Sequence, residues 1–175
     1  LAGFHVPDED SIQGVRKRLA NDGIQAYPVM RRMQGLMVAK GNPLKIKELK
    51  DVARQPIRFI NRQRGSGTRL LLDKLLNKLN IETGLINGYQ REEFTHTAIA
   101  TSILAKKADV GVGVKSIAIE NGLDFIQLKE ELFFLAMPND LALNKEVIQF
   151  IRKIRQLSGA IPGYKAMSLK HQMDG

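Results

Sequence analysis

The sequence predicts an α/β fold. Short apolar runs alternate with amphipathic helical patterns along most of the 175 residues, which is typical of α/β proteins. A second observation is a pair of similar segments, GLMVAKGNP at 35–43 and LFFLAMPND at 132–140, each an apolar strand that ends in a turn. Because a chain that crosses twice between two lobes uses two such strands, the pair predicts two lobes. Their expected boundaries are 1–40 with 130–175 for the first lobe, and 41–129 for the second.

The first third of the chain predicts three strands and two helices. The apolar run at 1–5 is the end of a buried strand. A helix is expected at 12–19, where acids and a serine precede an amphipathic pattern and Asn–Asp–Gly ends it. Apolar residues predict strands at 24–30 and 35–39. A Gly–Asn–Pro turn follows, and then a short helix at 46–53.

The middle of the chain continues the alternation. A short apolar strand at 57–60 runs through a polar loop into a strongly helical run at 69–79. The residues at 89–94 read as extended. A threonine then caps a helix at 96–106, and a glycine-broken strand is expected at 108–114.

The last third predicts a brief helix at 115–121 and two strands at 125–128 and 132–137. The helix expected at 145–157 is amphipathic, with apolar residues recurring at helical spacing. The tail at 162–175 shows no clear periodicity, so no element is expected there.

Composition bounds the function. A hydrophobic share of 43% is normal for a globular chain, and no apolar run approaches the about 18 residues of a membrane span. The absence of cysteine excludes disulfides, thiolate metal sites and a cysteine nucleophile, but it does not separate cytoplasm from periplasm. We expect a cytoplasmic protein, with the periplasm left open. The chain opens with leucine, so we expect a processed or excised piece.

The net charge of +9 raises the question of nucleic-acid binding. The basic residues occur in short groups interleaved with acids or apolar residues, as on solvated helix faces. No zinc-finger spacing, aromatic RNA-binding signature or long basic arm occurs. We therefore expect no direct binding of nucleic acid by this chain.

The loop RQRGSGTR is the most informative motif. It joins a strand to a helix and holds the arginines Arg62, Arg64 and Arg69 around Gly65, Ser66, Gly67 and Thr68. Small residues at such a junction let backbone N–H groups point at one spot, where the helix dipole and the arginines add positive charge. Two interpretations stay open: a binding place for a compact anion or carboxylate, or a simple helix cap by Ser66 or Thr68.

Several motifs together resemble a known family. FINRQRGSGTR, GYQREEFTHTAIA, KKADVGVGVKSIAIENGLDFIQL and a C-terminal PGY resemble the periplasmic-binding-protein-like domain that is fused to molybdopterin-biosynthesis proteins or to helix-turn-helix regulators. More distantly, the chain is similar to LysR-type effector domains and to molybdate- and sulfate-binding proteins. The resemblance implies a type-2 fold of two α/β lobes joined by two crossing strands, with the ligand in the cleft.

The resemblance also implies a function and partners. It implies non-catalytic binding or sensing of a small ligand: molybdate, tungstate or a molybdenum-cofactor-related anion. No cofactor is implied, and the partner is a fused or separate helix-turn-helix or molybdopterin-biosynthesis domain, which makes an effector domain of a transcription regulator one alternative. Relatives carry a further segment before the position of LAGFH. We therefore expect the first lobe to be incomplete here, and a homo-oligomer or a missing segment to complete it.

The candidate ligand-binding residues outside the loop lie on several expected elements. Arg32 matches a polar position of the family within RRMQGL. The acids of REE, before the helix at 96–106, are expected to balance nearby arginines. Each of the other candidates also has a structural interpretation, such as a helix cap, a close backbone approach or a packed side chain. These are His5, Thr95, His96, Gly111, Gly113 and Tyr164.

A hydrolase or transferase acting on an anionic substrate is the second class of function. The GSGT motif does not have the glycine spacing of a nucleophile elbow, and it lacks the lysine of a P-loop. A triad of Ser66, His96 and Glu93 can be drawn, but only geometry could support it. The three histidines are far apart and join no metal motif, so we expect no metal site. With none of these catalytic motifs present, we expect no catalysis.

Overall fold

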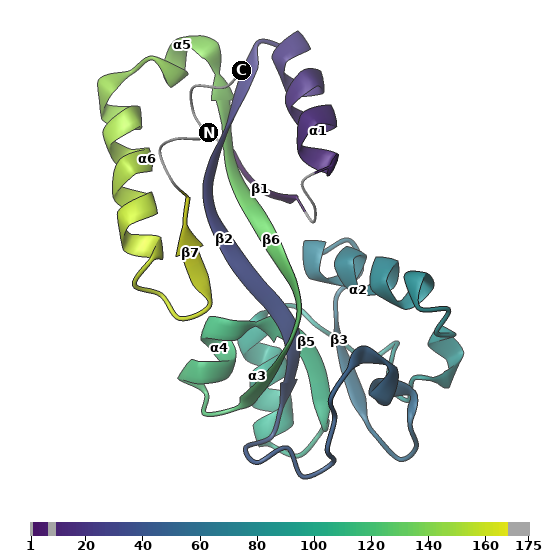
Figure 1. Cartoon of the computed structure of the whole chain (residues 1–175). Helices are drawn as coiled ribbons and strands as arrows, with labels where there is room; N and C mark the ends of the chain where they lie inside the picture. Colours follow the sequence, from purple (N-terminus) through teal and green to yellow (C-terminus); the bar gives the residue numbers. More distant parts are fainter. Residues whose placement is uncertain (1, 7–9, 168–175) are drawn as a thin grey trace. The chain divides into compact units, whose positions relative to one another are not determined.

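The computed structural model describes residues 2–6 and 10–167 of the chain. The chain divides into two compact units, which we call unit 1 (1–32 with 130–175) and unit 2 (33–129). Two long strands, β2 (Ile24–Val38) and β6 (Asp124–Pro138), contribute residues to both units (Figure 1). Strands and helices alternate in both units, so the predicted α/β class is confirmed.

In unit 1 the sheet is antiparallel. Strand β1 pairs with β6 from Ala2↔Ala136 to Val6↔Leu132, and β6 neighbours β2. A further strand, β7, pairs with β2. The two shorter strands are β1 (Ala2–Val6) and β7 (Tyr164–Ala166). The helices of unit 1 are α1 (Asp10–Asn21), α5 (Asn139–Ala142) and α6 (Lys145–Ser158).

Helix α6 covers the core of unit 1. Its N-cap is Asn144, whose side chain accepts bonds from two backbone N–H groups of the first turn, which satisfies donors that the helix itself cannot pair. Its Ile151 packs with Val29 and Met137 of the sheet in one apolar cluster. The amphipathic pattern predicted for this helix is therefore confirmed.

The long strands differ from the prediction, which divided each of them in two. Arg31 and Arg32 interrupt the apolar pattern of β2, and Glu130 and Glu131 interrupt that of β6. In the structure these interruptions face one another on neighbouring strands, with Arg31 3.6 Å from Glu130 and Arg32 3.1 Å from Glu131. Because each charge meets its opposite across the sheet, both strands continue without a break.

Unit 2 has a mixed sheet. Strand β2 pairs antiparallel with β5, β5 pairs parallel with β3, and β3 pairs parallel with β4. Its elements are η1 (Leu49–Ala53), β3 (Phe59–Arg62), α2 (Gly67–Lys78), η2 (Thr83–Leu85), β4 (Glu92–Glu93), α3 (His96–Leu104), β5 (Val110–Val114) and α4 (Lys115–Glu120).

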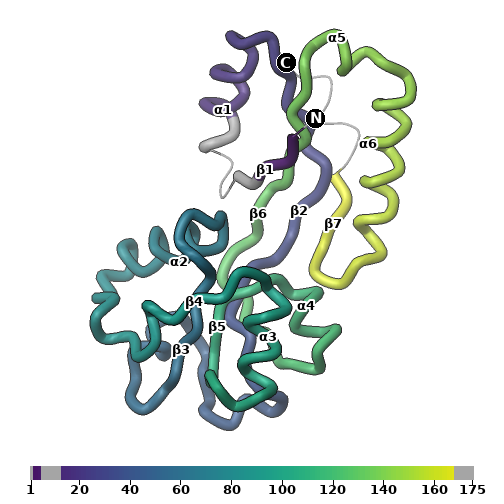
Figure 2. Tube along the Cα trace, turned by 180° about the vertical axis from the view of Figure 1, so that it is seen from behind, coloured from purple at the N-terminus to yellow at the C-terminus, as the bar shows by residue number. Residues whose placement is uncertain are grey.

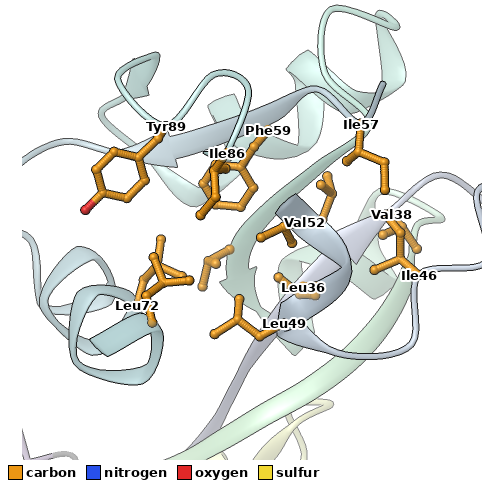
Figure 3. Packing of buried hydrophobic residues seen from close by; sticks show 13 residues of the cluster. Leu36, Val38, Ile46, Leu49, Val52, Ile57, Phe59, Leu72, Ile86 and Tyr89 are labelled. Atoms are coloured by element: carbon orange, nitrogen blue, oxygen red, sulfur yellow. The ribbon is translucent and has the colours of Figure 1, made fainter. Parts of the chain in front are cut away.

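The two faces of this sheet carry separate apolar clusters, because successive strand residues point to opposite faces. On one face Leu36, Phe59 and Val110 pack against Leu72 of α2 and Leu49 of η1 (Figure 3). The other face packs against the remaining helices. That cluster contains Met37 and Ile60 from the strands, with Ile99, Ala100 and Ile103 of α3 and Ala118 of α4. Unit 2 is thus three layers, with the sheet in the middle.

The short elements account for the other differences from the sequence-based prediction. The helix expected at 46–53 is a 3₁₀ turn limited to Leu49–Ala53. The structure also contains η2, α5 and β7, for which no element was predicted. Elements of three to five residues are too short to show a hydrophobic period, which explains why the pattern did not indicate them.

Candidate functional site

Three parallel strands of unit 2 end at the same edge of the sheet. The register places Arg62 of β3 opposite Glu93 of β4, and Ile60 of β3 opposite Gly111 of β5. Each strand leads into a helix, α2, α3 or α4, whose N-terminus therefore starts at this edge (Figure 2). The carboxyl ends of parallel strands are where α/β proteins place their ligands.

The N-terminus of α2 is built by the RQRGSGTR loop. The Ser66 hydroxyl accepts a bond from the backbone N–H of Arg69 at 3.2 Å and so acts as the N-cap. Gly65 has a φ of +82°, in the left-handed region that glycine adopts without strain, and Thr68 is buried. The first turn contains no acid. Of the two caps that the sequence allowed, Ser66 or Thr68, the structure confirms Ser66. Since the first turn has no acid, no carboxylate of that turn offsets the positive end of the helix dipole.

The N-terminus of α3 repeats this arrangement at the next strand. The Thr95 hydroxyl accepts from the N–H of Ala98 at 3.0 Å, and the first turn again has no acid. His96, half-buried, is the first residue of the helix. In any α-helix the first four N–H groups have no intrahelical acceptor, so two helices offer donors at one edge of unit 2.

Arg62 lies between these two loops. Arg62 is 9% exposed. The guanidinium donates from Nη2 to the carbonyl of Phe94, the residue before Thr95, at 2.9 Å, and from Nε to Oε1 of Gln63 at 3.1 Å. Phe94 belongs to the loop that leads into α3, and Gln63 belongs to the loop that leads into α2. Arg62 therefore joins the two helix N-termini and brings a positive charge to this edge.

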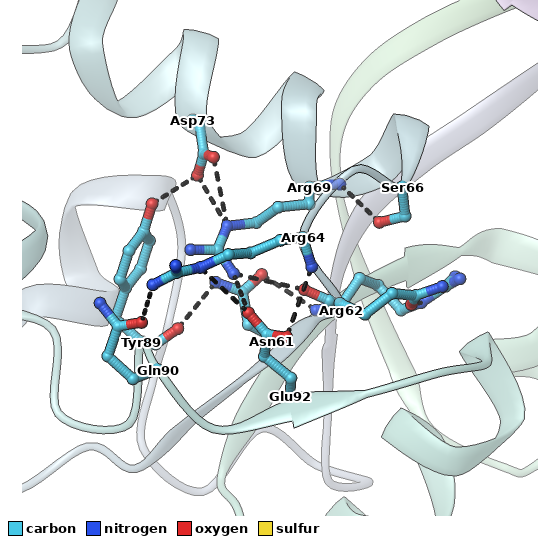
Figure 4. A network of polar contacts seen from close by, with 10 residues as sticks. Asn61, Arg62, Arg64, Ser66, Arg69, Asp73, Tyr89, Gln90 and Glu92 are labelled. Atoms are coloured by element: carbon cyan, nitrogen blue, oxygen red, sulfur yellow. Dashed lines mark hydrogen bonds and ion pairs between the residues drawn. The ribbon is translucent and has the colours of Figure 1, made fainter.

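The other two arginines of the loop turn toward acids (Figure 4). Arg69 is buried, 3.0 Å from Asp73 and 3.0 Å from Glu92. Arg64 is exposed and pairs with the same Glu92 at 3.7 Å. The interpretation that REE acids balance nearby arginines is confirmed for Glu92, and the charges of Arg64 and Arg69 are offset within unit 2.

Tyr89 completes this network. The Arg69 guanidinium lies over its ring, 4.2 Å from the centroid, and the Tyr89 hydroxyl donates to Asp73 at 2.6 Å. Burial opposes the charge on Arg69, but its contacts with Tyr89 and Asp73 outweigh burial and raise the pKa of Arg69. Burial, followed by the bond to Asp73, also raises the pKa of Tyr89. Both groups therefore hold their protons throughout the physiological pH range.

Gly111 and Gly113 lie on β5 with core side chains close above them. A Cβ on Gly111 would stand 2.5 Å from Cγ2 of Ile99 in α3, and one on Gly113 would stand 2.5 Å from Cε of Met37. Both glycines thus permit close packing within unit 2.

The remaining predicted site residues belong to unit 1. Arg32 forms an ion pair with Glu131 and lies opposite Tyr164 in the β2–β7 register. His5 is on β1, opposite Phe133, but the placement of its side chain lies outside what the structure describes. The predicted set thus falls into two groups, with His5, Arg32 and Tyr164 in unit 1 and the others in unit 2.

The residues of the conceivable triad have other contacts in the structure. Ser66 serves as the cap of α2, and Glu93 accepts a bond from the hydroxyl of Ser102 at 3.3 Å. Among the described residues, no three histidines or acids gather where they could hold a metal ion. None of the helices that the structure describes is long and apolar enough to span a membrane.

Sequence reasoning did not identify Asp73 and Tyr89 as partners of the loop. Asp73 lies four residues after Arg69 on α2, and an acid at that spacing from an arginine is a recognisable helix pair. Tyr89 lies twenty residues away in sequence, and no local pattern indicates its contact with Arg69.

These features define a class of protein: an α/β domain of two units, crossed by two long strands, with helix N-termini at a strand edge. Residues 1–155 match the model of the PBP superfamily domain, and the chain belongs to that superfamily, the periplasmic-binding-protein-like domains. The resemblance that the motifs indicated is confirmed.

Relatives and solved structures agree with this assignment. The chain is 34% identical over 158 residues to the protein YvgK of Bacillus subtilis (strain 168), covering 88% of this chain and 50% of YvgK, so it spans about half the length of that relative. The regulatory domain of MetR, a LysR family regulator from N. meningitidis, aligns with a TM-score of 0.66 at 14% identity, over 95% of this chain and 74% of that one. A substrate-binding domain assigned to a molybdenum ABC transporter of Clostridium difficile aligns with a TM-score of 0.57 at 12% identity, over 95% and 77%. The fold is therefore of the type-2 periplasmic-binding kind, which these neighbours use as regulatory and substrate-binding domains.

Proposed function

We propose that the chain is a non-catalytic binding or sensing domain for a small anion, which is held at the N-termini of α2 and α3 in unit 2. The observation that carries this proposal is the shared edge, where two long helices begin after parallel strands, each capped by a hydroxyl and each without an acid in its first turn. Backbone N–H groups and helix dipoles at such an edge stabilise an anion without further charge.

Arg62 supplies the charge of the proposed site. Its guanidinium donates to the carbonyl of Phe94 and to Gln63, which places it beside the loops that lead into α3 and α2. A hydrogen bond to a charged group contributes about 1.5–3 kcal/mol, so a single well-placed guanidinium adds substantially to the affinity. The anion that we propose is an oxyanion such as molybdate or tungstate, or a molybdenum-cofactor-related anion. The molybdenum transporter domain among the structural neighbours supports this choice.

The proposed partner is a second domain that responds to the bound anion. The MetR neighbour is the regulatory domain of a LysR family regulator, which supports a regulator, and so a helix-turn-helix domain, as the partner. A molybdopterin-biosynthesis domain is the other proposed partner, from the motifs that resemble domains fused to such proteins.

Titration calorimetry with molybdate, tungstate, sulfate and phosphate tests the proposal, and we expect heat of binding for at least one of them. The substitution Gly67→Asp locates the site. A Cβ at this first position of α2 has nothing within 4 Å, and an acid there favours the helix by about 0.3–1 kcal/mol. It should keep the fold while it repels the anion, so we expect at least a tenfold loss of affinity.

Gly67→Asn is the matched control, since it has the same size without the charge. The proposal predicts that Gly67→Asn binds far more tightly than Gly67→Asp. Equal affinities of the two variants would show that the anion does not bind at the N-terminus of α2. The absence of heat with all four anions would contradict the proposal that the ligand is an oxyanion.

A further inference from the structure

Arg69 holds both ends of the loop that precedes α2. Its backbone N–H donates to the Ser66 hydroxyl at 3.2 Å, and its side-chain Nη1 donates to the carbonyl of Arg62 at 3.3 Å. Arg62 is the last residue of β3, and Ser66 is the N-cap of α2. One residue thus contacts the two points between which the glycine-containing loop runs.

The Arg69 side chain is itself fixed from several directions. It is 4% exposed, and it donates to Asp73 on its own helix and to Glu92 on β4. The central carbon of the guanidinium lies over the ring of Tyr89, 4.2 Å from the centroid. Tyr89 is fixed in turn, because its hydroxyl donates to Asp73 and its carbonyl accepts from Nδ2 of the buried Asn61 at 3.1 Å. The guanidinium is therefore part of the interior of unit 2.

Only an arginine can make this set of contacts. The guanidinium is planar, with donors that point in fixed directions around its edge, and its face can stack on an aromatic ring. A lysine keeps the charge, but its three donors share one nitrogen and cannot reach acceptors that are spread around the edge of a guanidinium.

We propose that Arg69 is a positioning residue of the anion site, which fixes the 62–66 loop through the Arg62 carbonyl and the Ser66 cap and does not contact the anion. This proposal rests on the proposed function of the α2 N-terminus. It separates Arg69 from Arg64, which pairs with the same Glu92 but has a side chain that is 74% exposed. The two arginines carry equal charges, so position alone distinguishes them.

Charge-conserving substitutions test the proposal. If only charge mattered, neither Arg69→Lys nor Arg64→Lys would change binding. We expect Arg69→Lys to speed backbone hydrogen exchange at residues 63–68 about tenfold in the protein without anion, and Arg64→Lys to change it less than twofold. For the anion that binds best among molybdate, tungstate, sulfate and phosphate, Arg69→Lys should weaken affinity about tenfold, and Arg64→Lys should weaken it less than twofold.

Asp73→Asn provides a second variant in case Arg69→Lys does not fold, since it keeps Arg69 and weakens one of its bonds. We expect faster exchange confined to 63–68 in this variant too. The amides of β5 report on opening of unit 2 as a whole. Equal acceleration at β5 and at 63–68 would show that Arg69 supports the fold only, and equal effects of the lysine variants would overturn the proposal.

The same measurements separate this proposal from the function on which it rests. If the unmodified chain binds none of the four anions, the proposed function fails, and exchange at 63–68 still decides whether Arg69 fixes the loop. If the chain binds an anion and Arg69→Lys loosens the loop without loss of affinity, the function stands and the positioning role is wrong.

Discussion

Gly111 lets helix α3 approach the sheet of unit 2 closely. It lies on β5 opposite Ile60, and the side chain of Ile99 occupies the space where a Cβ would stand. The backbone carbonyl of Ile60 is also within 2.8 Å of that position. Because a backbone atom cannot move aside as a flexible side chain can, a methyl group at this position would force the backbone to shift. Close packing of α3 at this point brings its N-terminus to the strand edge.

We expect Gly111→Ala to destabilise unit 2 by about 1–3 kcal/mol, the usual cost of overpacking a core. Urea unfolding followed by circular dichroism measures this difference. Gly84→Ala is the matched control, since nothing lies within 4 Å of the added methyl group and no positive φ is required there. A loss of stability no larger than that of the control would show that α3 can shift to accept the methyl group.

At the scale of elements, Arg58 and Asp109 fix the starts of β3 and β5 to each other. The Asp109 carboxylate accepts from Nε and Nη2 of Arg58 at 3.0 and 2.7 Å and from its backbone N–H at 2.8 Å, while the Asp109 N–H donates back to the Arg58 carbonyl. The side-chain bonds from Arg58 are the main cause that lowers the pKa of Asp109 below its ordinary value of 3.8. The ionised form is therefore the one that the fold prefers.

This preference predicts the direction of a pH effect. A carboxyl whose pKa is lowered by folding stabilises the protein fully above its unfolded pKa, and it loses this contribution as the pH falls through the folded pKa. We expect Asp109→Asn to be less stable than the unmodified chain at pH 7, with the difference shrinking below about pH 4. Chemical unfolding from pH 7 to pH 2.5 tests this, with the exposed Glu120→Gln as control. A difference that stays constant with pH would mean that the ionisation of Asp109 does not contribute.

The helices and strands that position the site were predicted well from the sequence, and the contacts within the site were predicted less well. Helices α2 and α3 were predictable because apolar periodicity and a capping residue coincide at each. The continuity of β2 and β6 was not, because the ion pairs that bridge their polar interruptions join residues about a hundred positions apart. Contacts between distant residues also decide what the RQRGSGTR loop does, although its sequence suggested three arginines beside a ligand. Its local pattern could not show that Glu92 and Tyr89 would engage two of them.

At the scale of the whole molecule, charge and apolar cores are both distributed by unit. Unit 2 holds 16 basic and nine acidic residues, and unit 1 holds 11 and nine, so seven of the nine surplus positive charges lie in unit 2. Such a surplus draws small anions toward the unit that carries the proposed site. Both apolar clusters on the sheet of unit 2 consist of residues between Met33 and Lys129, and the clusters around β1, β6 and α6 consist of unit 1 residues.

A unit with its own core has the basis to fold without the rest of the chain. We therefore expect the fragment 33–129 to fold and to unfold cooperatively on heating, since every member of its two clusters is retained. Because α2, α3 and Arg62 are all within it, the fragment should also prefer the same anion as the whole chain, with an affinity reduced by whatever unit 1 contributes. Calorimetric unfolding and the four-anion titration measure both properties, and the reciprocal piece, with 1–32 joined to 130–175, is the control for binding. A fragment that melts without cooperativity would show that the cores depend on each other, and anion binding by the reciprocal piece alone would place the site in unit 1.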